Sequence, residues 1–161
     1  MAQTFSERLT ELGIELPAVA APVAAYVPAV KAGNTVYTSG QLPFVNGELP
    51  ATGLVGDAEG ESTPDVTPEQ AYDLARTAAL NAVAAVDALV GIDNITQVVK
   101  VNGFVASARG FGGQPAVING ASEVLGEIFG DAGVHARAAV GVAELPLNAP
   151  VEVEIVVTVA E

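Results

Sequence analysis

Arg137 stands in a setting that suggests chemistry, because it shares an otherwise apolar stretch with the only histidine of the chain, His135. The stretch is VHARAAVGVAELP, residues 134–146, and the protein has only six lysines and arginines among its 161 residues. A guanidinium is a rigid fork of donors that fits a carboxylate with two hydrogen bonds. The sequence therefore indicates a site for a molecule that carries a carboxylate.

Two glutamates near the C-terminus, Glu152 and Glu154, bear on this hypothesis. If the segments around them and around Arg137 are strands, alternate side chains share a face. The apolar residues that alternate with them along this segment should then contact helices, and we expect Arg137, Glu152 and Glu154 on the opposite face, either solvated or covered by another subunit. These apolar residues are Val151, Val153, Ile155, Val157 and Val159. The simpler interpretation is an ion pair between Arg137 and one of the glutamates, which is common on exposed strands.

Composition excludes several classes of chemistry. The chain has no cysteine and one histidine, so disulfides, thiolate catalysis and Cys- or His-rich metal sites are ruled out within one chain. A net charge of −13 without any basic cluster argues against binding to nucleic acid. No apolar run reaches the ~18 residues of a membrane span, and the N-terminus lacks the apolar core of a signal peptide. We therefore expect a cytoplasmic protein with no membrane partner.

The length of 161 residues predicts one domain over residues 1–161, with an N-terminal helix and connector in residues 1–22. Its clearest helix begins with a capping box from Thr67 to Gln70 and ends at Gly91. Because helices alternate with strands, we expect an α+β fold in which two crossover helices cover one face of a mixed sheet. The predicted elements are a helix at 4–13, strands at 26–30 and 35–44, a helix at 68–90, a strand at 95–108, a helix at 115–130, and strands at 136–145 and 151–160.

Three local patterns complete this picture. Ser6 is a candidate cap for the first helix, which Gly13 should end. The dipeptide Asn46-Gly47 is typical of a tight hairpin turn, because both residues tolerate positive φ. Residues 53–66 are rich in glycine and acidic residues, and they predict a solvated loop.

The stretch HARAAVGVAELPLNAPVEVEIVV resembles the C-terminal signature of the RidA (YjgF) family of reactive intermediate deaminases. The resemblance covers nearly the whole chain, since TVYTSGQLP, VVKVNGFVAS and VINGASEVLGEIFG follow in the family's order. The longer N-terminal helix and the acidic loop are more similar to a divergent branch. The resemblance implies a chorismate-mutase-like fold, a trimeric barrel-like assembly, and a small-molecule cleft between subunits.

The resemblance also implies an activity, the hydrolysis of enamines or imines such as 2-iminopropionate to 2-oxo acids and ammonia. Arg137 matches the residue that binds the substrate carboxylate, and Glu152 matches the acidic residue that positions water. Neither a metal nor an organic cofactor is implied. The matched residues that would line the pocket are Tyr26, Ser39, Gly40, Phe104 and Asn119.

Departures from the family pattern leave other interpretations open. Ala139 replaces a cysteine found in better-known members, and His135 replaces a proline, so that this histidine is either a structural donor or an acid or base at the site. The alternative to an enzyme is a small-ligand-binding or regulatory trimer that uses the same cleft. A ribonuclease role, sometimes attached to this family, conflicts with the charge of −13.

Overall fold

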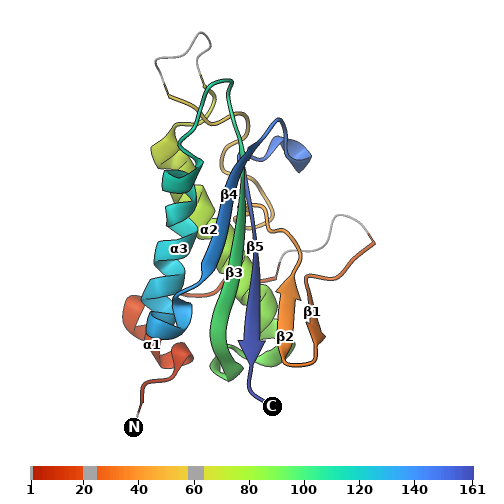
Figure 1. Cartoon of the computed structure of the whole chain (residues 1–161), viewed down its shortest axis with the longest axis vertical. Helices are drawn as coiled ribbons and strands as arrows, with labels where there is room; N and C mark the ends of the chain where they lie inside the picture. The colour runs from red at the N-terminus through yellow and green to blue at the C-terminus, as the bar shows by residue number, and fades with distance from the viewer. Residues whose placement is uncertain (1, 20–24, 58–63) are drawn as a thin grey trace.

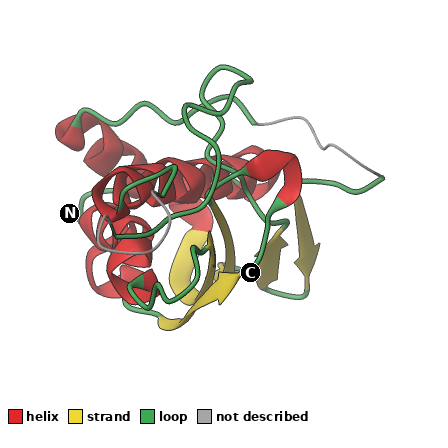
Figure 2. Ribbon diagram, turned by 90° about the horizontal axis from the view of Figure 1, so that it is seen from above, coloured by secondary structure: helices red, strands yellow, loops and turns green. Residues whose placement is uncertain are grey.

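The computed structural model of the protein describes residues 2–19, 25–57 and 64–161. These residues form a five-stranded mixed sheet that is covered on one face by helices (Figures 1 and 2). This is the α+β architecture that the sequence predicts. The strands lie in the order β1-β2-β5-β3-β4. The elements are α1 (Phe5–Leu12), β1 (Ala29–Ala32), β2 (Thr35–Thr38), α2 (Pro68–Val90), β3 (Ile95–Ala106), α3 (Gln114–Phe129), β4 (Ala136–Val142) and β5 (Val151–Val159).

Helices α2 and α3 are the crossover connections. Helix α3 joins β3 to β4, which pair in parallel, whereas all other neighbouring strands pair antiparallel. Helix α2 carries the chain from β2 past β5 to β3. Strand β4 is thus an edge strand that lies beside α3 (Figure 1).

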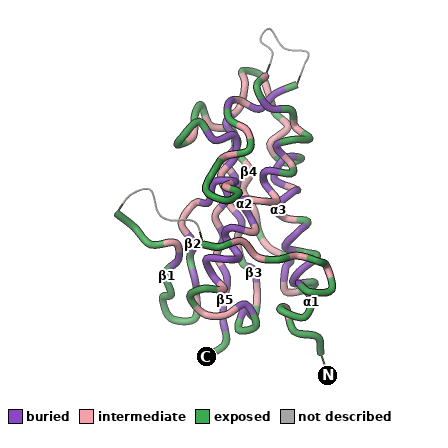
Figure 3. The backbone as a smooth tube through the Cα atoms, turned by 180° about the vertical axis from the view of Figure 1, so that it is seen from behind, coloured by how far each residue is buried: buried purple, intermediate pink, exposed green. Residues whose placement is uncertain are grey.

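The ends of α2 follow the predicted capping. Thr67 Oγ1 accepts a hydrogen bond from the Gln70 amide at 3.1 Å, and Gln70 Oε1 accepts one from the Thr67 amide at 2.9 Å. Gly91, with φ of 82°, then ends the helix. The alanines of α2 are small enough for the helix axis to lie close to the sheet, and its buried residues form the centre of the core (Figure 3).

The N-cap of the first helix lies two residues before the predicted one. Thr4, not Ser6, is the N-cap, because Glu7 stands three residues after Thr4 and completes a capping box. Ser6 instead donates its hydroxyl hydrogen to Asp93 at 2.6 Å and ties α1 to the turn before β3. Gly13 ends the helix in the left-handed conformation, as predicted.

The Asn46-Gly47 turn is confirmed, with φ of 52° and 82° and a bridge between Val45 and Glu48. The predicted solvated loop is wrong at its two ends, where Val55 and Val66 are fully buried and form a bridge with each other. Both valine side chains therefore pack in the core, where the sequence predicts contact with solvent. The acidic stretch at 58–63 lies outside the described residues.

Strand β5 shows the predicted alternation. Val151, Val153, Ile155, Val157 and Val159 are buried against the helices, while the residues between them are half-buried on the open face of the sheet. No helix in the described parts of the chain is both long and apolar enough to span a membrane.

Candidate functional site

Arg137 lies on the helix-covered face of the sheet, not on the open face with Glu152 and Glu154 as the sequence predicts. Its Cα pairs with that of Val101 on β3, which in turn pairs with Ile155 on β5, and both of these neighbours are buried. Residues paired across strands point to the same face. Alternation along β4 was predicted correctly, but it does not reveal which of its two faces meets α3.

Helix α3 supplies the partners of the Arg137 guanidinium. Nη1 donates to Asn119 Oδ1 at 2.7 Å and lies 3.3 Å from Ser122 Oγ. Asn119 and Ser122 are three residues apart and therefore share one face of the helix. The structure thus brings Arg137 and Asn119 together, while neither Glu152 nor Glu154 forms an ion pair with Arg137 in the described structure. The expected surface ion pair is wrong.

His135 extends this cluster. Its Nε2 lies 2.9 Å from Ser122 Oγ and its Nδ1 lies 2.6 Å from the Gly133 carbonyl oxygen. The sequence interpretation missed Ser122, although its spacing of three from Asn119 was a usable signal. We call the group Asn119, Ser122, His135 and Arg137 the arginine cluster.

Glu152 belongs to a second cluster on the open face of the sheet. Its carboxylate presses on Gly40, where an added Cβ would stand 2.8 Å from the Glu152 carboxyl carbon. Any larger residue at position 40 would displace this carboxylate. Phe104 is the Cα partner of Glu152 on β3. We call Ser39, Gly40, Phe104 and Glu152 the glutamate cluster.

Ser39 connects this cluster to the segment before β1. Its hydroxyl donates to the Val27 carbonyl oxygen at 2.6 Å, and its amide donates to the Pro28 carbonyl oxygen at 2.8 Å. These bonds hold the segment that carries Tyr26 beside Gly40. Tyr26 itself is 44% exposed, so it lies outside the buried core.

Burial raises the pKa of Glu152 above its ordinary value, and the neighbouring charge of Glu154 raises it further. The carboxylate of Glu154 instead accepts a hydrogen bond from the Asn102 amide at 3.0 Å. A carboxyl group with a raised pKa holds its proton to higher pH and is a better proton acceptor once ionised. Glu152 is therefore suited to take a proton from water.

The raised pKa predicts how Glu152→Gln changes stability with pH. Folding favours protonated Glu152, so this residue costs no stability below the pKa of an unfolded glutamate, about 4.3, and costs progressively more as pH rises through the folded value. The variant should therefore gain stability over wild type at pH 7 and lose that gain at pH 4. Urea denaturation at both pH values measures this difference. An equal difference at both would contradict the assignment.

The two clusters do not meet within one chain. Arg137 and Glu152 stand on opposite faces of the sheet, with β3 between their strands. Strand spacing and rise put their Cα atoms on the order of 14 Å apart. A single small substrate cannot contact both residues in one subunit.

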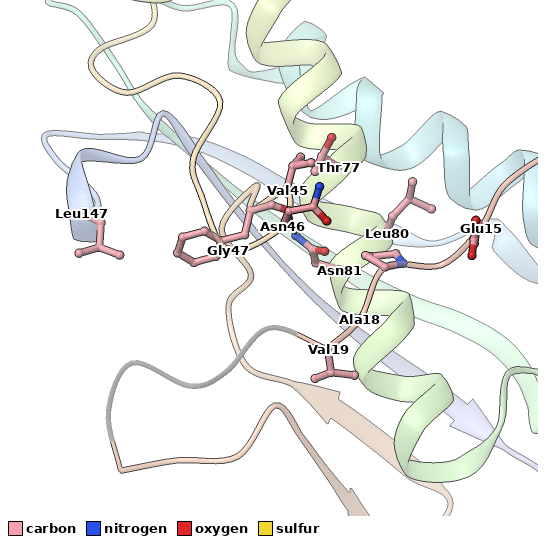
Figure 4. Close-up of a pocket in the computed structure, with 12 residues that line it drawn as sticks. Glu15, Ala18, Val19, Val45, Asn46, Gly47, Thr77, Leu80, Asn81 and Leu147 are labelled. Carbon is pink, nitrogen blue, oxygen red and sulfur yellow. Dashed lines mark hydrogen bonds between the residues drawn. The ribbon is translucent and has the colours of Figure 1, made fainter.

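A cavity of about 710 Å³ lies elsewhere, between α2, the turn at 45–48, Leu147 and the connector after α1 (Figure 4). None of the predicted site residues lines it. Its lining is mainly apolar, and its only charged lining residue is Glu15, which would repel a carboxylate. This cavity is therefore not the carboxylate site that Arg137 indicates.

Comparisons with known proteins agree with this fold. Residues 6–159 match the family model described as "YjgF/chorismate_mutase-like, putative endoribonuclease". The chain is 41% identical over 151 residues to protein TCP17 of Trypanosoma cruzi, covering 92% of this chain and 90% of that protein. It is 34% identical over 146 residues to a 2-iminobutanoate/2-iminopropanoate deaminase of Dermatophagoides farinae, covering 91% and 94%.

Solved structures show the same relationship. The Agrobacterium tumefaciens protein Atu1372, of unknown function, superimposes with a TM-score of 0.83 at 42% identity, covering 97% of this chain and 92% of that one. Escherichia coli TdcF with bound serine superimposes with a TM-score of 0.60 at 26% identity, covering 89% and 94%. The protein belongs to the YjgF/chorismate mutase-like family.

Proposed function

We propose that this protein hydrolyses enamine or imine intermediates of 2-oxo acids, such as 2-iminopropionate, in the cytoplasm. The observation that carries the proposal is the Arg137 guanidinium, which Asn119 orients at 2.7 Å in a cluster without any carboxylate partner among the described residues. Such a fork is available to a substrate carboxylate. The deaminase name of the mite relative and the serine bound to TdcF support a small amino- or imino-acid ligand.

The chemistry needs few groups. Water adds to the carbon of the protonated imine and gives one proton to the Glu152 carboxylate, which leaves a neutral carbinolamine. Glu152 returns that proton to the carbinolamine nitrogen, the C–N bond breaks as the C=O bond of the 2-oxo acid forms, and the hydroxyl proton leaves with the ammonia as ammonium, so that one water is consumed for each ammonia released. Holding substrate and water in register supplies most of the acceleration. No redox partner is required by this balance.

The separation of the two clusters favours a site between subunits. We propose a homotrimer in which the arginine cluster of one subunit faces the glutamate cluster of the next. The open face of the sheet carries exposed Val30, Tyr37 and Val140, which a neighbouring subunit would cover. Each subunit then contributes one half to each of two sites. Tyr26, Ser39, Gly40 and Phe104 would line the pocket from the Glu152 side.

A mixed-subunit assay tests both activity and assembly. The iminopropionate released by an amino acid oxidase is trapped with semicarbazide, and an active deaminase lowers the trapped amount. Arg137→Ala and Glu152→Gln should each be inactive as pure proteins. Unfolded together and refolded as mixed trimers, they should recover activity at about a quarter of the sites, because only one combination joins intact Arg137 to intact Glu152.

Two results would contradict the proposal. If the mixed protein stays inactive while size-exclusion chromatography shows trimers, the two residues do not share a site. If wild type does not lower trapping but 2-oxo acids raise its melting temperature, the protein is the ligand-binding or regulatory trimer that the sequence left open.

A further inference from the structure

We infer that His135 controls, through Ser122, how many hydrogen bonds the arginine cluster offers to a bound carboxylate, so that protonation of His135 tightens ligand binding. This inference rests on the proposed carboxylate site and names a positioning residue within it.

The hydrogen-bond geometry fixes where the protons lie. The Gly133 carbonyl can only accept, so His135 Nδ1, 2.6 Å away, carries a hydrogen. In the neutral imidazole Nε2 is then the acceptor, and the Ser122 hydroxyl at 2.9 Å donates to it. Arg137 Nη1, at 3.3 Å from Ser122 Oγ, donates to the same hydroxyl oxygen. In this series of hydrogen bonds, Arg137 thus donates to Ser122, and Ser122 donates to His135.

Protonation of His135 reverses one bond in this series. The imidazolium has a hydrogen on both nitrogens, so Nε2 donates to Ser122 Oγ instead of accepting from it. The serine oxygen then accepts from both His135 and Arg137, and its own hydrogen is released. The Ser122 hydroxyl becomes a hydrogen-bond donor for a ligand beside Arg137. The positively charged imidazolium of His135 is then linked to the guanidinium by two hydrogen bonds, both through Ser122 Oγ. Both changes favour an anion.

Other charged groups near this cluster have their own partners or point elsewhere. On α3, Glu123 accepts from the Tyr72 hydroxyl and Glu127 pairs with Arg76 at 3.3 Å, both toward α2. On β3, Lys100 pairs in register with Ala136, on the face opposite to Arg137. Asp131, in the turn two residues before Gly133, is exposed to solvent. His135 is therefore the ionisable group that contacts Ser122 beside Arg137.

The first test reads the tautomer directly. Because His135 is the only histidine, the imidazole ¹⁵N spectrum of labelled protein contains one residue. At high pH we expect the Nδ1–H tautomer, and Ser122→Ala should shift the Nε2 resonance. An Nε2–H tautomer would overturn the inference, whatever the enzyme's activity. So would an Nε2 resonance whose chemical shift is unchanged in Ser122→Ala.

The second test measures binding. Pyruvate is titrated by calorimetry at pH 8 and pH 5.5 in the Glu152→Gln background, which removes the Glu152 carboxyl group, whose pKa is raised by burial. We expect about ten-fold tighter binding at pH 5.5, the effect of one added hydrogen bond to a charged group. His135→Gln and Ser122→Ala should each abolish this dependence while circular dichroism and assembly size stay unchanged.

The outcomes separate this inference from the proposed function. If pyruvate binds with the same pH dependence in Ser122→Ala, the hydroxyl reversal is wrong and the carboxylate site remains. If pyruvate binds nowhere in this pH range to wild type or background, the carboxylate site itself fails and the inference fails with it.

Discussion

Arg137→Ala should lower kcat/KM for iminopropionate hydrolysis by about 100-fold, corresponding to a loss of about 3 kcal/mol of transition-state binding. The guanidinium is the permanent cation of the arginine cluster, and its hydrogen-bond partners among the described residues are Asn119 and Ser122. Its removal therefore takes away the carboxylate anchor while leaving the apolar core intact. Semicarbazide trapping across a range of substrate concentrations measures the change.

Two variants control this result. Arg109→Ala changes the net charge by the same amount at an exposed position in the turn after β3, and it should leave kcat/KM unchanged. Arg137→Lys keeps a positive charge but loses the planar fork, and it should restore only part of the rate. Full activity of Arg137→Ala would exclude the arginine cluster as the substrate site.

Gly120→Ala should destabilise the fold by about 3 kcal/mol, because the new methyl group would overlap the backbone of α2. An added Cβ at Gly120 collides with the Tyr72 carbonyl oxygen and stands 2.9 Å from its carbonyl carbon. Backbone cannot move aside as a side chain can, so α2 and α3 must separate. The midpoint of urea denaturation reports this loss.

Gly126→Ala is the matched control for that variant. The same change is made in the same helix, but nothing lies within 4 Å of the added Cβ. Alanine reduces the conformational entropy of the unfolded chain and favours helix, so this variant should be more stable than wild type by about 0.5 kcal/mol. Equal destabilisation by both changes would show that helix contact at Gly120 is not the cause.

The local elements of the fold could be predicted because their signals are local. The Thr67 capping box, the Asn46-Gly47 turn and the alternation along β5 each depend on residues a few positions apart. Ser6 was chosen wrongly because the competing cap, Thr4, requires the side chain of Glu7 to be considered at the same time. The burial of Val55 depends on distant partners, Val66 and Ser107, which no local pattern reveals.

The candidate site residues came from residue types, spacing and the family resemblance, but their arrangement on the sheet was not predicted. Alternation shows which residues of one strand share a face of the sheet. Which residues of two different strands share a face depends on the register in which the strands pair. Placing Arg137 on the face of Glu152 assumed a register that pairing with β3 does not have. The spacing of three from Asn119 indicates only that Ser122 shares a helix face with it, and the contact of Ser122 with Arg137 appears only when α3 lies on the sheet.

The two halves of the proposed site differ in how far apart along the chain their contacts are. Arg137 and Asn119 are separated by only 18 positions and lie within one strand-helix-strand unit, β3-α3-β4. The glutamate cluster depends on β2 and β5, where Thr38 and Ile155 bond across 117 positions. Closing a long loop costs more entropy and slows folding. During folding, the arginine half should therefore acquire its geometry before the glutamate half, and a partly folded chain would display only one of the two.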